Sequence, residues 1–320
     1  MSNLSSDAIN SKRILVFGKD GQVGRALKDC LKDFHPPIVF LGRKDCDLTN
    51  KLALKDVLNR YQPQVIINAA AYTSVDRAET DENLAYAINR DAVALMAEHI
   101  ANVAGSTLVH FSTDYVYSGS KQGAYLESDD AEPLNLYGKS KLAGEKELIK
   151  AFQAVAHSEI SSRYFILRTS WVYGDGTNFI RTMLRLASEK DCLHVVADQY
   201  GAPTSADWLA SIATQLIKSQ AKSGVYHAVV DGHTTWHELA VFVIGLAKEF
   251  GCTLKVKSDS ILPINSSEYP TAALRPKNSC LDNSKLKQLL AEISYANHIP
   301  LWKDQVREYL KSYAQKALKE

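Results

Sequence analysis

Short apolar runs alternate with amphipathic segments through the first half of the chain. From Arg13 the sequence reads RILVFG, a run of β-branched and aromatic residues that ends in glycine, and an amphipathic helix is predicted from Gln22 to about Leu31. The pattern then recurs, with predicted strands at 38–41, 65–68, 107–111 and 164–167 and predicted helices at 51–60, 83–104 and 137 to about 152. Such alternation predicts right-handed βαβ crossovers and a parallel sheet.

The predicted strands are almost continuously apolar. The runs ILVF, VIIN and LVHF suit strands that are buried on both faces by helices. We therefore predict an α/β fold with a Rossmann-type, doubly wound parallel sheet formed by residues 12–170.

The second half of the chain has a less regular pattern. Helices are predicted at 178–187, 208–217 and 236–249 and from Trp302 onward, with a strand at 193–196. Prolines punctuate residues 258–278, which predicts a loop with little regular structure that closes over a ligand. We expect residues 171–320 to form mainly a smaller substrate-binding lobe, with some segments returning to the Rossmann core.

Composition excludes several classes of protein. The 37 basic and 36 acidic residues give a net charge of +1, so no global field favours nucleic acid or an anionic membrane. The five cysteines are scattered without zinc-ligand spacing, which indicates a reducing, cytoplasmic setting and no metal. Residues 1–11 are polar and are expected to be a flexible tail without a secretory signal, and the sequence has no run long enough for a membrane helix.

A glycine-rich turn follows the first predicted strand. Gly18, Gly21 and Gly24 form a GxxGxxG pattern, with Gln22 and Val23 opening the helix. Glycines at this place let the backbone approach a pyrophosphate, which the helix N-terminus attracts. The alternative is an ordinary turn with a helix cap, but the strand before it and the helix after it favour a dinucleotide site.

Residues at the ends of the next two strands refine this site. Arg43 follows the second strand, where an acidic residue would accept a hydrogen bond from the 2′-hydroxyl of NAD. A guanidinium suits a 2′-phosphate instead, so the sequence predicts NADPH as the preferred cofactor and NADH as the second choice. The alternative interpretation of Arg43 is a solvated surface side chain. The other residues expected to border the cofactor are Asp47, Leu48, Ala70, Ala71, Tyr72 and Thr73.

Candidate catalytic side chains follow the fourth strand and open the next helix. Thr113 and Asp114 follow the strand, and the spacing of four residues places Tyr137 and Lys141 on one helix face. Alone, this YxxxK spacing is typical of a solvated helix face. After a dinucleotide turn it predicts reduction of a carbonyl: Thr113 polarises the carbonyl, Asp114 receives a hydroxyl of the substrate, and Tyr137 donates the proton. Lys141 is expected to lower the pKa of Tyr137 and to bind the nicotinamide ribose.

With these motifs the chain resembles the dTDP-4-dehydrorhamnose reductase family of extended short-chain dehydrogenases from Arg13 onward. The segments that carry the resemblance are GKDGQVG at 18–24, NAAAYTSVDRAE at 68–79, STDYVY at 112–117, PLNLYGKSKLAGE at 133–145, RTSWVYG at 168–174, DQYGAPT at 198–204 and RPKNSCL at 275–281. The resemblance implies reduction of dTDP-4-dehydro-L-rhamnose at C4 with NADPH, with Thr113, Tyr137 and Lys141 as catalytic residues. It also implies that Trp171 lines the sugar pocket and that Arg275 holds the diphosphate.

One departure from the family concerns assembly. Some members form dimers around magnesium through glutamates, and this chain has Ala26 and Asp207 at the matching positions. We therefore expect a monomer or a homodimer, without a dimer bridged by metal.

Two other functions fit the same motifs. A nucleotide-sugar epimerase or dehydratase would keep its NAD bound and reoxidise it in each cycle, whereas Arg43 favours an exchangeable NADPH. The fold also resembles the non-catalytic β subunit of methionine adenosyltransferase, a regulatory protein. The presence of Thr113, Tyr137 and Lys141 together favours an enzyme.

Overall fold

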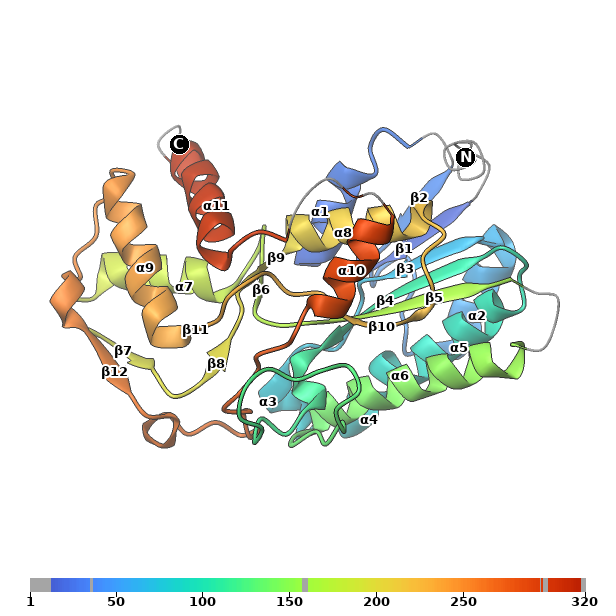
Figure 1. The fold of residues 1–320 in the computed structure, drawn as a ribbon, viewed down its shortest axis with the longest axis horizontal. Coiled ribbons are helices and arrows are strands. Elements are labelled where there is room, and N and C mark those ends of the chain that lie inside the picture. Colours follow the sequence, from blue (N-terminus) through green and yellow to red (C-terminus); the bar gives the residue numbers. More distant parts are fainter. Residues whose placement is uncertain (1–12, 35–36, 157–160, 294, 296–298, 318–320) are drawn as a thin grey trace.

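The computed structural model describes residues 13–34, 37–156, 161–293, 295 and 299–317, and a six-stranded parallel sheet lies at its centre (Figure 1). The strands, in spatial order, are β10 (Gly224–His227), β5 (Arg163–Thr169), β4 (Thr107–Thr113), β3 (Val65–Asn68), β1 (Ile14–Phe17) and β2 (Ile38–Leu41). Every neighbouring pair is parallel. The predicted α/β class with a doubly wound parallel sheet is confirmed. The predicted tail at 1–11 lies outside the described residues.

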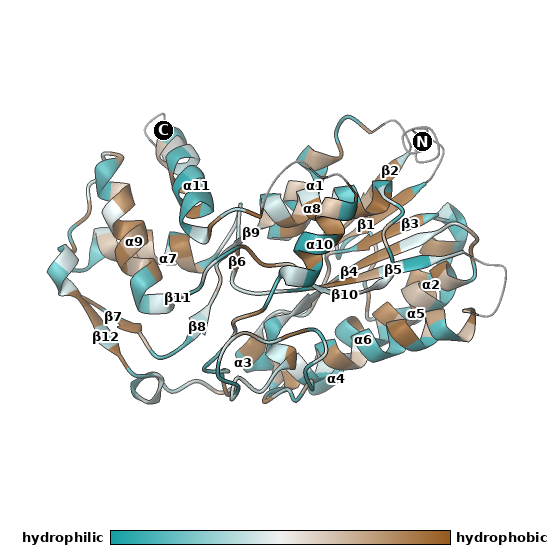
Figure 2. Ribbon diagram, in the orientation of Figure 1, coloured by the Kyte–Doolittle hydropathy of each residue, from teal (hydrophilic) through white to brown (hydrophobic). Residues whose placement is uncertain are grey.

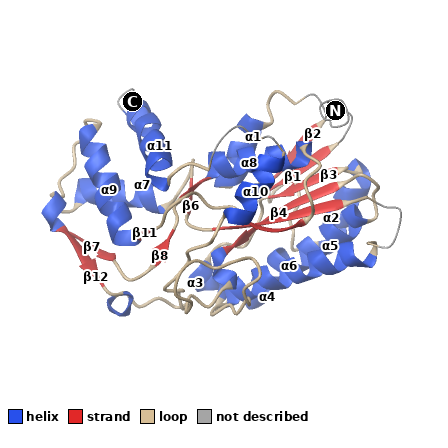
Figure 3. Ribbon diagram, viewed as in Figure 1, coloured by secondary structure: helices blue, strands red, loops and turns tan. Residues whose placement is uncertain are grey.

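Helices cover both faces of the sheet (Figures 1 and 3). One face packs against α1 (Gln22–Cys30), α8 (Ala206–Lys218) and α10 (Ser284–Glu292). The other face packs against α2 (Lys51–Tyr61), α5 (Ala92–Ala101) and α6 (Leu136–Ala154). Ile14 and Val16 belong to the first core cluster, and Leu15 and Phe17 belong to the second. Since side chains alternate along a strand, an apolar run is what burial on both faces requires, and Figure 2 shows the strands as largely hydrophobic.

The glycine turn lies at the point where the order of the strands reverses. The chain passes from β1 to β2 on one side and then to β3 on the other side of β1. In open α/β sheets, ligands bind at such a switch point, beyond the carboxyl ends of the strands. The loops after β1, β2, β3 and β4 all open toward this edge.

A smaller lobe follows the sheet in the second half of the chain (Figure 1). It contains α7 (Phe179–Glu189), α9 (Trp236–Glu249), α11 (Trp302–Ala317) and a parallel pair made by β7 (Leu193–Val196) and β12 (Ile261–Ile264). The pairs β6 (Val172–Tyr173) with β9 (Thr204–Ser205) and β8 (Tyr200–Gly201) with β11 (Thr234–Thr235) contribute two residues from each strand. Among the described residues, no helix has the length and apolar character needed to cross a bilayer.

Two predictions about the elements are wrong in part. Residues 258–278 hold β12 and two turns of 3₁₀ helix, η3 (Ser258–Ser260) and η4 (Ser266–Glu268), because β12 gains its hydrogen bonds from β7, which is distant in sequence. The helix predicted at 83–104 is divided into α4 (Glu82–Tyr86), a π-helical turn η1 (Ala87–Asp91) and α5, and a short α3 (Val75–Ala78) precedes it. The π turn contains Asn89, whose amide binds both backbone groups of Tyr72 and the Ser140 hydroxyl.

Candidate functional site

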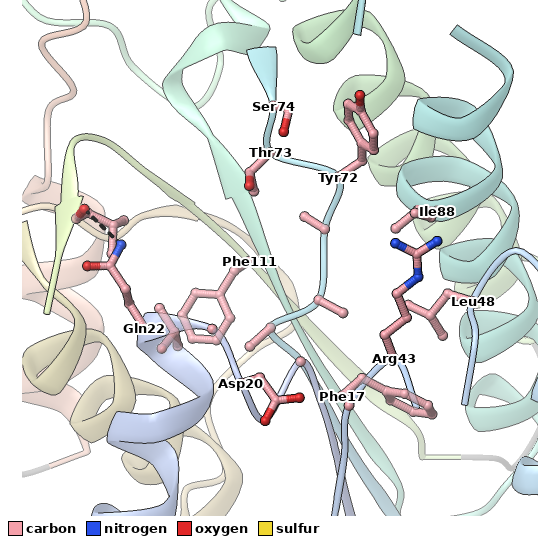
Figure 4. A pocket seen from close by; sticks show the side chains of 18 of the residues that line it. Phe17, Asp20, Gln22, Arg43, Leu48, Tyr72, Thr73, Ser74, Ile88 and Phe111 are labelled. Atoms are coloured by element: carbon pink, nitrogen blue, oxygen red, sulfur yellow. Dashed lines mark hydrogen bonds between the residues drawn. The ribbon is translucent and has the colours of Figure 1, made fainter. Parts of the chain in front are cut away.

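A cavity of about 760 Å³ opens at the carboxyl edge of the sheet (Figure 4). Thirteen of the residues expected to contact the cofactor line it: Gly18, Gly21, Gln22, Val23, Arg43, Asp47, Leu48, Ala70, Ala71, Tyr72, Thr73, Tyr137 and Lys141. These residues come from the loops after β1, β2 and β3, from the start of α1 and from α6. The cavity is large enough for a cofactor of dinucleotide size, and its lining fits that group.

The turn after β1 has the geometry that a pyrophosphate site needs. Gly18 has φ +86°, a conformation that side chains with a Cβ rarely adopt, and a Cβ there would lie 2.6 Å from the Ala69 backbone. A Cβ on Gly24 would lie 2.0 Å from the Gly18 carbonyl oxygen, so a glycine lets α1 begin directly against the turn. Gly21 precedes α1 and provides no side-chain cap, and Gly21, Gln22 and Val23 line the cavity, so the first N–H groups of the helix are left for a ligand.

Arg43 stands at the end of β2 beside Leu48 and Ile88 (Figure 4). Its side chain is 78% exposed, and its Nε lies 3.9 Å from an Asp47 carboxylate oxygen, which is a weak ion pair. The guanidinium is therefore free to turn toward an anionic group in the cavity. Asp47 itself accepts hydrogen bonds from the backbone and hydroxyl of Thr49, which lower its pKa.

The candidate catalytic residues meet where β4 ends and α6 begins. Thr113 and Asp114 are buried, and the Thr113 hydroxyl donates to the Asp114 carboxylate at 2.9 Å and accepts from the Tyr115 backbone N–H. Burial raises the pKa of Tyr137 to about 12, while a hydrogen bond with Thr113 lowers it and the Asp114 charge raises it. Thr113 therefore connects Asp114 with Tyr137. The Thr113 hydroxyl must turn away from the Asp114 carboxylate before it can donate a hydrogen bond to a substrate oxygen.

Lys141 is turned toward β4. Its Nζ donates to the Phe111 carbonyl oxygen at 2.6 Å and lies 3.2 Å from His110 Nε2. Burial lowers the pKa of Lys141 to about 8, against a smaller raising effect of Glu145. In this arrangement burial of the phenol dominates the pKa of Tyr137 and the Lys141 amine is engaged by the strand, so the lowering of the Tyr137 pKa by Lys141 stays a prediction.

The first turn of α6 is anchored from several directions, which fixes the Tyr137 backbone. Asn135 caps the helix by accepting from the Gly138 N–H at 2.8 Å, and its amide donates to the Leu274 carbonyl at 2.8 Å. The Leu136 N–H donates to Glu79 at 2.8 Å. A side-chain cap of this type contributes about 1 kcal/mol to a helix. The helix's own cap and contacts with two separate segments, at Glu79 and Leu274, thus hold the start of α6.

Trp171 lies at the boundary between the sheet and the smaller lobe. Its φ of +47° is rare for a residue with a Cβ, and its ring stacks on Trp236 with the centroids 3.5 Å apart. A Cβ on Gly201 would lie 2.5 Å from the indole, so the glycine makes room for the ring. The surrounding structure thus maintains an unfavourable backbone conformation in order to place an aromatic side chain, which is typical of ligand sites.

Arg275 is held in an ion pair across the two parts of the chain. Its Nη1 and Nη2 donate to the two carboxylate oxygens of Asp76 at 2.8 and 2.6 Å. Nη1 also donates to the Ala273 carbonyl. A diphosphate bound by Arg275 would have to share or replace this bidentate contact.

The two positions that depart from the family lie where the first helix meets α8. Ala26 is buried in this interface, and Asp207 is in the first turn of α8. Within the described ranges, no three His, Cys, Asp or Glu side chains lie close enough to hold a metal ion.

Asp114 provides a test of site electrostatics through stability. Burial raises its pKa to about 6, whereas hydrogen bonds from Ser279 and Thr113 lower it. An unfolded aspartate titrates near about 3.9, so the stabilisation from this group is present below about pH 4 and is lost as pH rises through 6. We expect Asp114→Asn to raise the free energy of unfolding at pH 7.5 by about 1 to 3 kcal/mol and to reduce this pH dependence.

Urea unfolding at pH 7.5 and pH 5 measures the effect of Asp114→Asn. The matched control is Asp47→Asn, because hydrogen bonds lower the pKa of Asp47 and give its contribution the opposite sign with pH. A lower stability of Asp114→Asn at pH 7.5 would contradict the assigned environment.

Several residues of the site were not predicted. Asn68, His110 and Glu145 are buried beside the catalytic residues, and Asn89 holds the Tyr72 loop. The available signal was a polar residue inside an otherwise apolar strand, in VIIN and LVHF. A buried polar side chain needs a partner, so such an interruption marks a position with a specific contact.

Comparison with known proteins agrees with this geometry. Residues 12–315 match the family model described as the RmlD substrate binding domain. The chain is 40% identical over 305 residues to dTDP-4-dehydrorhamnose reductase of Shigella flexneri, covering 93% of this chain and 96% of that relative. The solved reductase of Clostridium acetobutylicum is 34% identical with a TM-score of 0.81, covering 96% of this chain and 100% of that one. The Bacillus anthracis reductase, solved in complex with NADP, is 32% identical with a TM-score of 0.81, covering 94% and 99%. The resemblance drawn from the motifs is therefore confirmed, and the chain belongs to the dTDP-4-dehydrorhamnose reductase family.

Proposed function

We propose that the protein reduces the C4 keto group of dTDP-4-dehydro-L-rhamnose to give dTDP-L-rhamnose, with NADPH as the reductant. The observation that carries this proposal is that Tyr137, which is hydrogen-bonded to Thr113, and Lys141 line the same cavity as the glycine turn and Arg43. The named activity of the relatives agrees with it. The five cysteines are free, and we expect a cytoplasmic enzyme that acts as a monomer or homodimer.

The chain supplies binding and proton transfer for this reaction. The glycine turn and the N-terminus of α1 hold the pyrophosphate, and Arg43 binds the 2′-phosphate. NADPH supplies the hydride when it is bound. The Thr113 hydroxyl turns away from Asp114 and donates a hydrogen bond to the C4 oxygen. Tyr137 transfers its phenolic proton to the resulting alkoxide.

The deciding assay follows NADPH oxidation with freshly prepared dTDP-4-dehydro-L-rhamnose and identifies the product sugar by chromatography. We expect one NADPH to be consumed for each sugar reduced. Formation of an epimer without added NADPH, from protein that is purified with NAD bound, would support an epimerase and overturn the reductase. A protein that binds NADPH without turnover would support a regulatory subunit instead.

Arg43→Ala tests the preference for NADPH. Loss of a charge-assisted contact of about 1.5 to 3 kcal/mol should raise KM for NADPH about 10- to 100-fold, and KM for NADH should stay within a few-fold of wild type. Arg60→Ala removes an exposed arginine near the end of α2 and serves as the control. An unchanged ratio of the two KM values in Arg43→Ala would show that Arg43 is only a solvated side chain.

A further inference from the structure

A buried row of polar side chains passes beneath the catalytic tyrosine. Asn68 at the end of β3, His110 in the middle of β4 and Lys141 on α6 are each 0 to 1% exposed. Asn68 Nδ2 lies 3.1 Å from His110 Nδ1, and His110 Nε2 lies 3.2 Å from Lys141 Nζ. Because buried polar groups are costly unless they are paired, the direction of each hydrogen bond in this row carries information.

The backbone fixes the orientation of the Asn68 amide. The Ala70 N–H donates to Asn68 Oδ1 at 3.1 Å, so Nδ2 is the amide atom that faces His110. Nδ2 only donates, and His110 Nδ1 must therefore accept. Complete burial holds the pKa of His110 well below its usual range, so its ring is neutral and has a single N–H. That hydrogen must be on Nε2.

The Nε2–H of His110 consequently points at Lys141. An ammonium has no lone pair, so a charged Lys141 would place two donors 3.2 Å apart. A neutral amine accepts from Nε2–H while it donates to the Phe111 carbonyl at 2.6 Å. Every hydrogen bond in the row is satisfied only when Lys141 is neutral.

The other charged groups near Lys141 act in the opposite direction or are already paired. Glu145 lies one turn further along α6 and favours the ammonium, but its carboxylate is bound by Arg168 at 2.6 Å. Tyr137 lies one turn earlier on α6 and is neutral, since burial raises its pKa to about 12. On the β4 side, His110 is the titratable group facing the amine within the described part of the chain.

We propose that His110, oriented by Asn68, is a positioning residue that presents an N–H to Lys141 and thereby makes the Lys141 ammonium a ready source of protons for the site. This inference rests on the proposed function through the roles of Tyr137 and Lys141. When Tyr137 has given its proton to the alkoxide, the phenolate is reprotonated at the expense of the Lys141 ammonium, one helical turn away on α6. The N–H bond at Nζ breaks, the O–H bond forms, and the freed lone pair accepts from His110 Nε2–H. Water then returns a proton to Lys141.

Asn68→Asp is expected to reverse the donor and acceptor roles in the hydrogen bonds of this row. The carboxylate keeps the size of the amide and still accepts from the Ala70 N–H, but it now accepts from His110 Nδ1–H as well. Nε2 then becomes the acceptor and stabilises the ammonium. Activity is lost at high pH when the Tyr137–Lys141 pair loses a proton. We expect this alkaline limb of kcat/KM to move to higher pH by about one unit or more in Asn68→Asp.

His110→Asn separates this effect from the added negative charge. Its amide oxygen can accept from Asn68 at the place of Nδ1, and the N–H that faces Lys141 is removed. We expect the alkaline limb to move in the same direction by a smaller amount. His99→Asn, which replaces a half-buried histidine on α5, is the control and should leave the limb in place.

A second readout does not need turnover. The difference in unfolding free energy between each protein and its Lys141→Met version, measured as a function of pH, reports the pH at which Lys141 loses its proton in the folded state. With a folded pKa of about 8 and an unfolded value near about 10.4, the contribution of Lys141 to stability should rise with pH between these values. This rise should begin at higher pH in Asn68→Asp and His110→Asn.

The outcomes distinguish this inference from the proposed function. Wild type that fails to reduce the sugar would overturn the function, while the stability readout still decides the role of His110. The inference would be overturned if the alkaline limb of kcat/KM and the pH at which the Lys141 contribution to stability begins to rise were both unchanged in Asn68→Asp and His110→Asn. A shift in Asn68→Asp alone would also overturn it, because the added charge would then explain the shift without His110. Shifts in both variants, absent in His99→Asn, would support it.

Discussion

Replacing Tyr137 with phenylalanine is expected to lower kcat/KM for the 4-keto sugar by about 10²-fold or more at pH 7, because general acid catalysis typically contributes that much. The hydroxyl that is removed is linked to Thr113 and lies at the cavity rim. Phenylalanine fills nearly the same space beside Tyr115, whose ring centroid is 5.8 Å from that of Tyr137. Steady-state NADPH oxidation over a range of sugar concentrations measures the effect.

The matched control for this substitution is Tyr226→Phe. It removes a tyrosine hydroxyl that donates to the Lys222 carbonyl at 2.8 Å, in the strand β10 at the outer edge of the sheet. Its activity should stay within a few-fold of wild type. NADPH binding, measured by fluorescence titration, should be similar in wild type and Tyr137→Phe. A Tyr137→Phe enzyme with nearly full kcat/KM would show that another group donates the proton.

The parts of the fold that depend on local pattern were predictable from the sequence. The apolar runs located β2 and β3 at their observed bounds, because strands buried on both faces must be apolar throughout. The glycine turn was predictable because its geometry requires a particular residue type. Gly18 has a positive φ and Gly24 has no room for a Cβ, and glycine meets both requirements. Wherever one residue type satisfies a steric demand, sequence alone locates the feature.

Features that depend on distant partners were not predictable. β12 forms because β7 supplies its hydrogen bonds, and residues 258–278 alone resemble a loop. The direction of the Lys141 amine depends on the Phe111 carbonyl and on His110, neither of which the YxxxK spacing reveals. Local propensity is a weak guide wherever tertiary contacts decide the outcome.

A buried ion pair beneath the catalytic residues should dominate the stability of this region. Glu145 on α6 is 1% exposed, and Arg168 at the end of β5 is 7% exposed. Arg168 Nη2 donates to Glu145 at 2.6 Å and its Nη1 donates to the Tyr117 hydroxyl at 2.6 Å, while the Ser112 hydroxyl donates to Glu145 as well. Burial acts to lower the pKa of Arg168, but the Glu145 charge and hydrogen bonds raise it overall. The pair thus joins α6 to β4 and β5 directly behind the site.

Arg168→Met is therefore expected to lower the free energy of unfolding by about 3 to 5 kcal/mol, because it leaves the Glu145 carboxylate buried without its charged partner. The double variant Glu145→Leu/Arg168→Met removes both charges and should recover a large part of that loss, since a buried pair adds little beyond apolar groups of similar size. Arg185→Met, on the exposed pair with Glu189, is the control and should change stability by less than about 1 kcal/mol. Urea unfolding monitored by circular dichroism measures all three. A double variant no more stable than Arg168→Met would mean that the shape and hydrogen bonds of these side chains, and not the unpaired charge, hold α6 against the sheet.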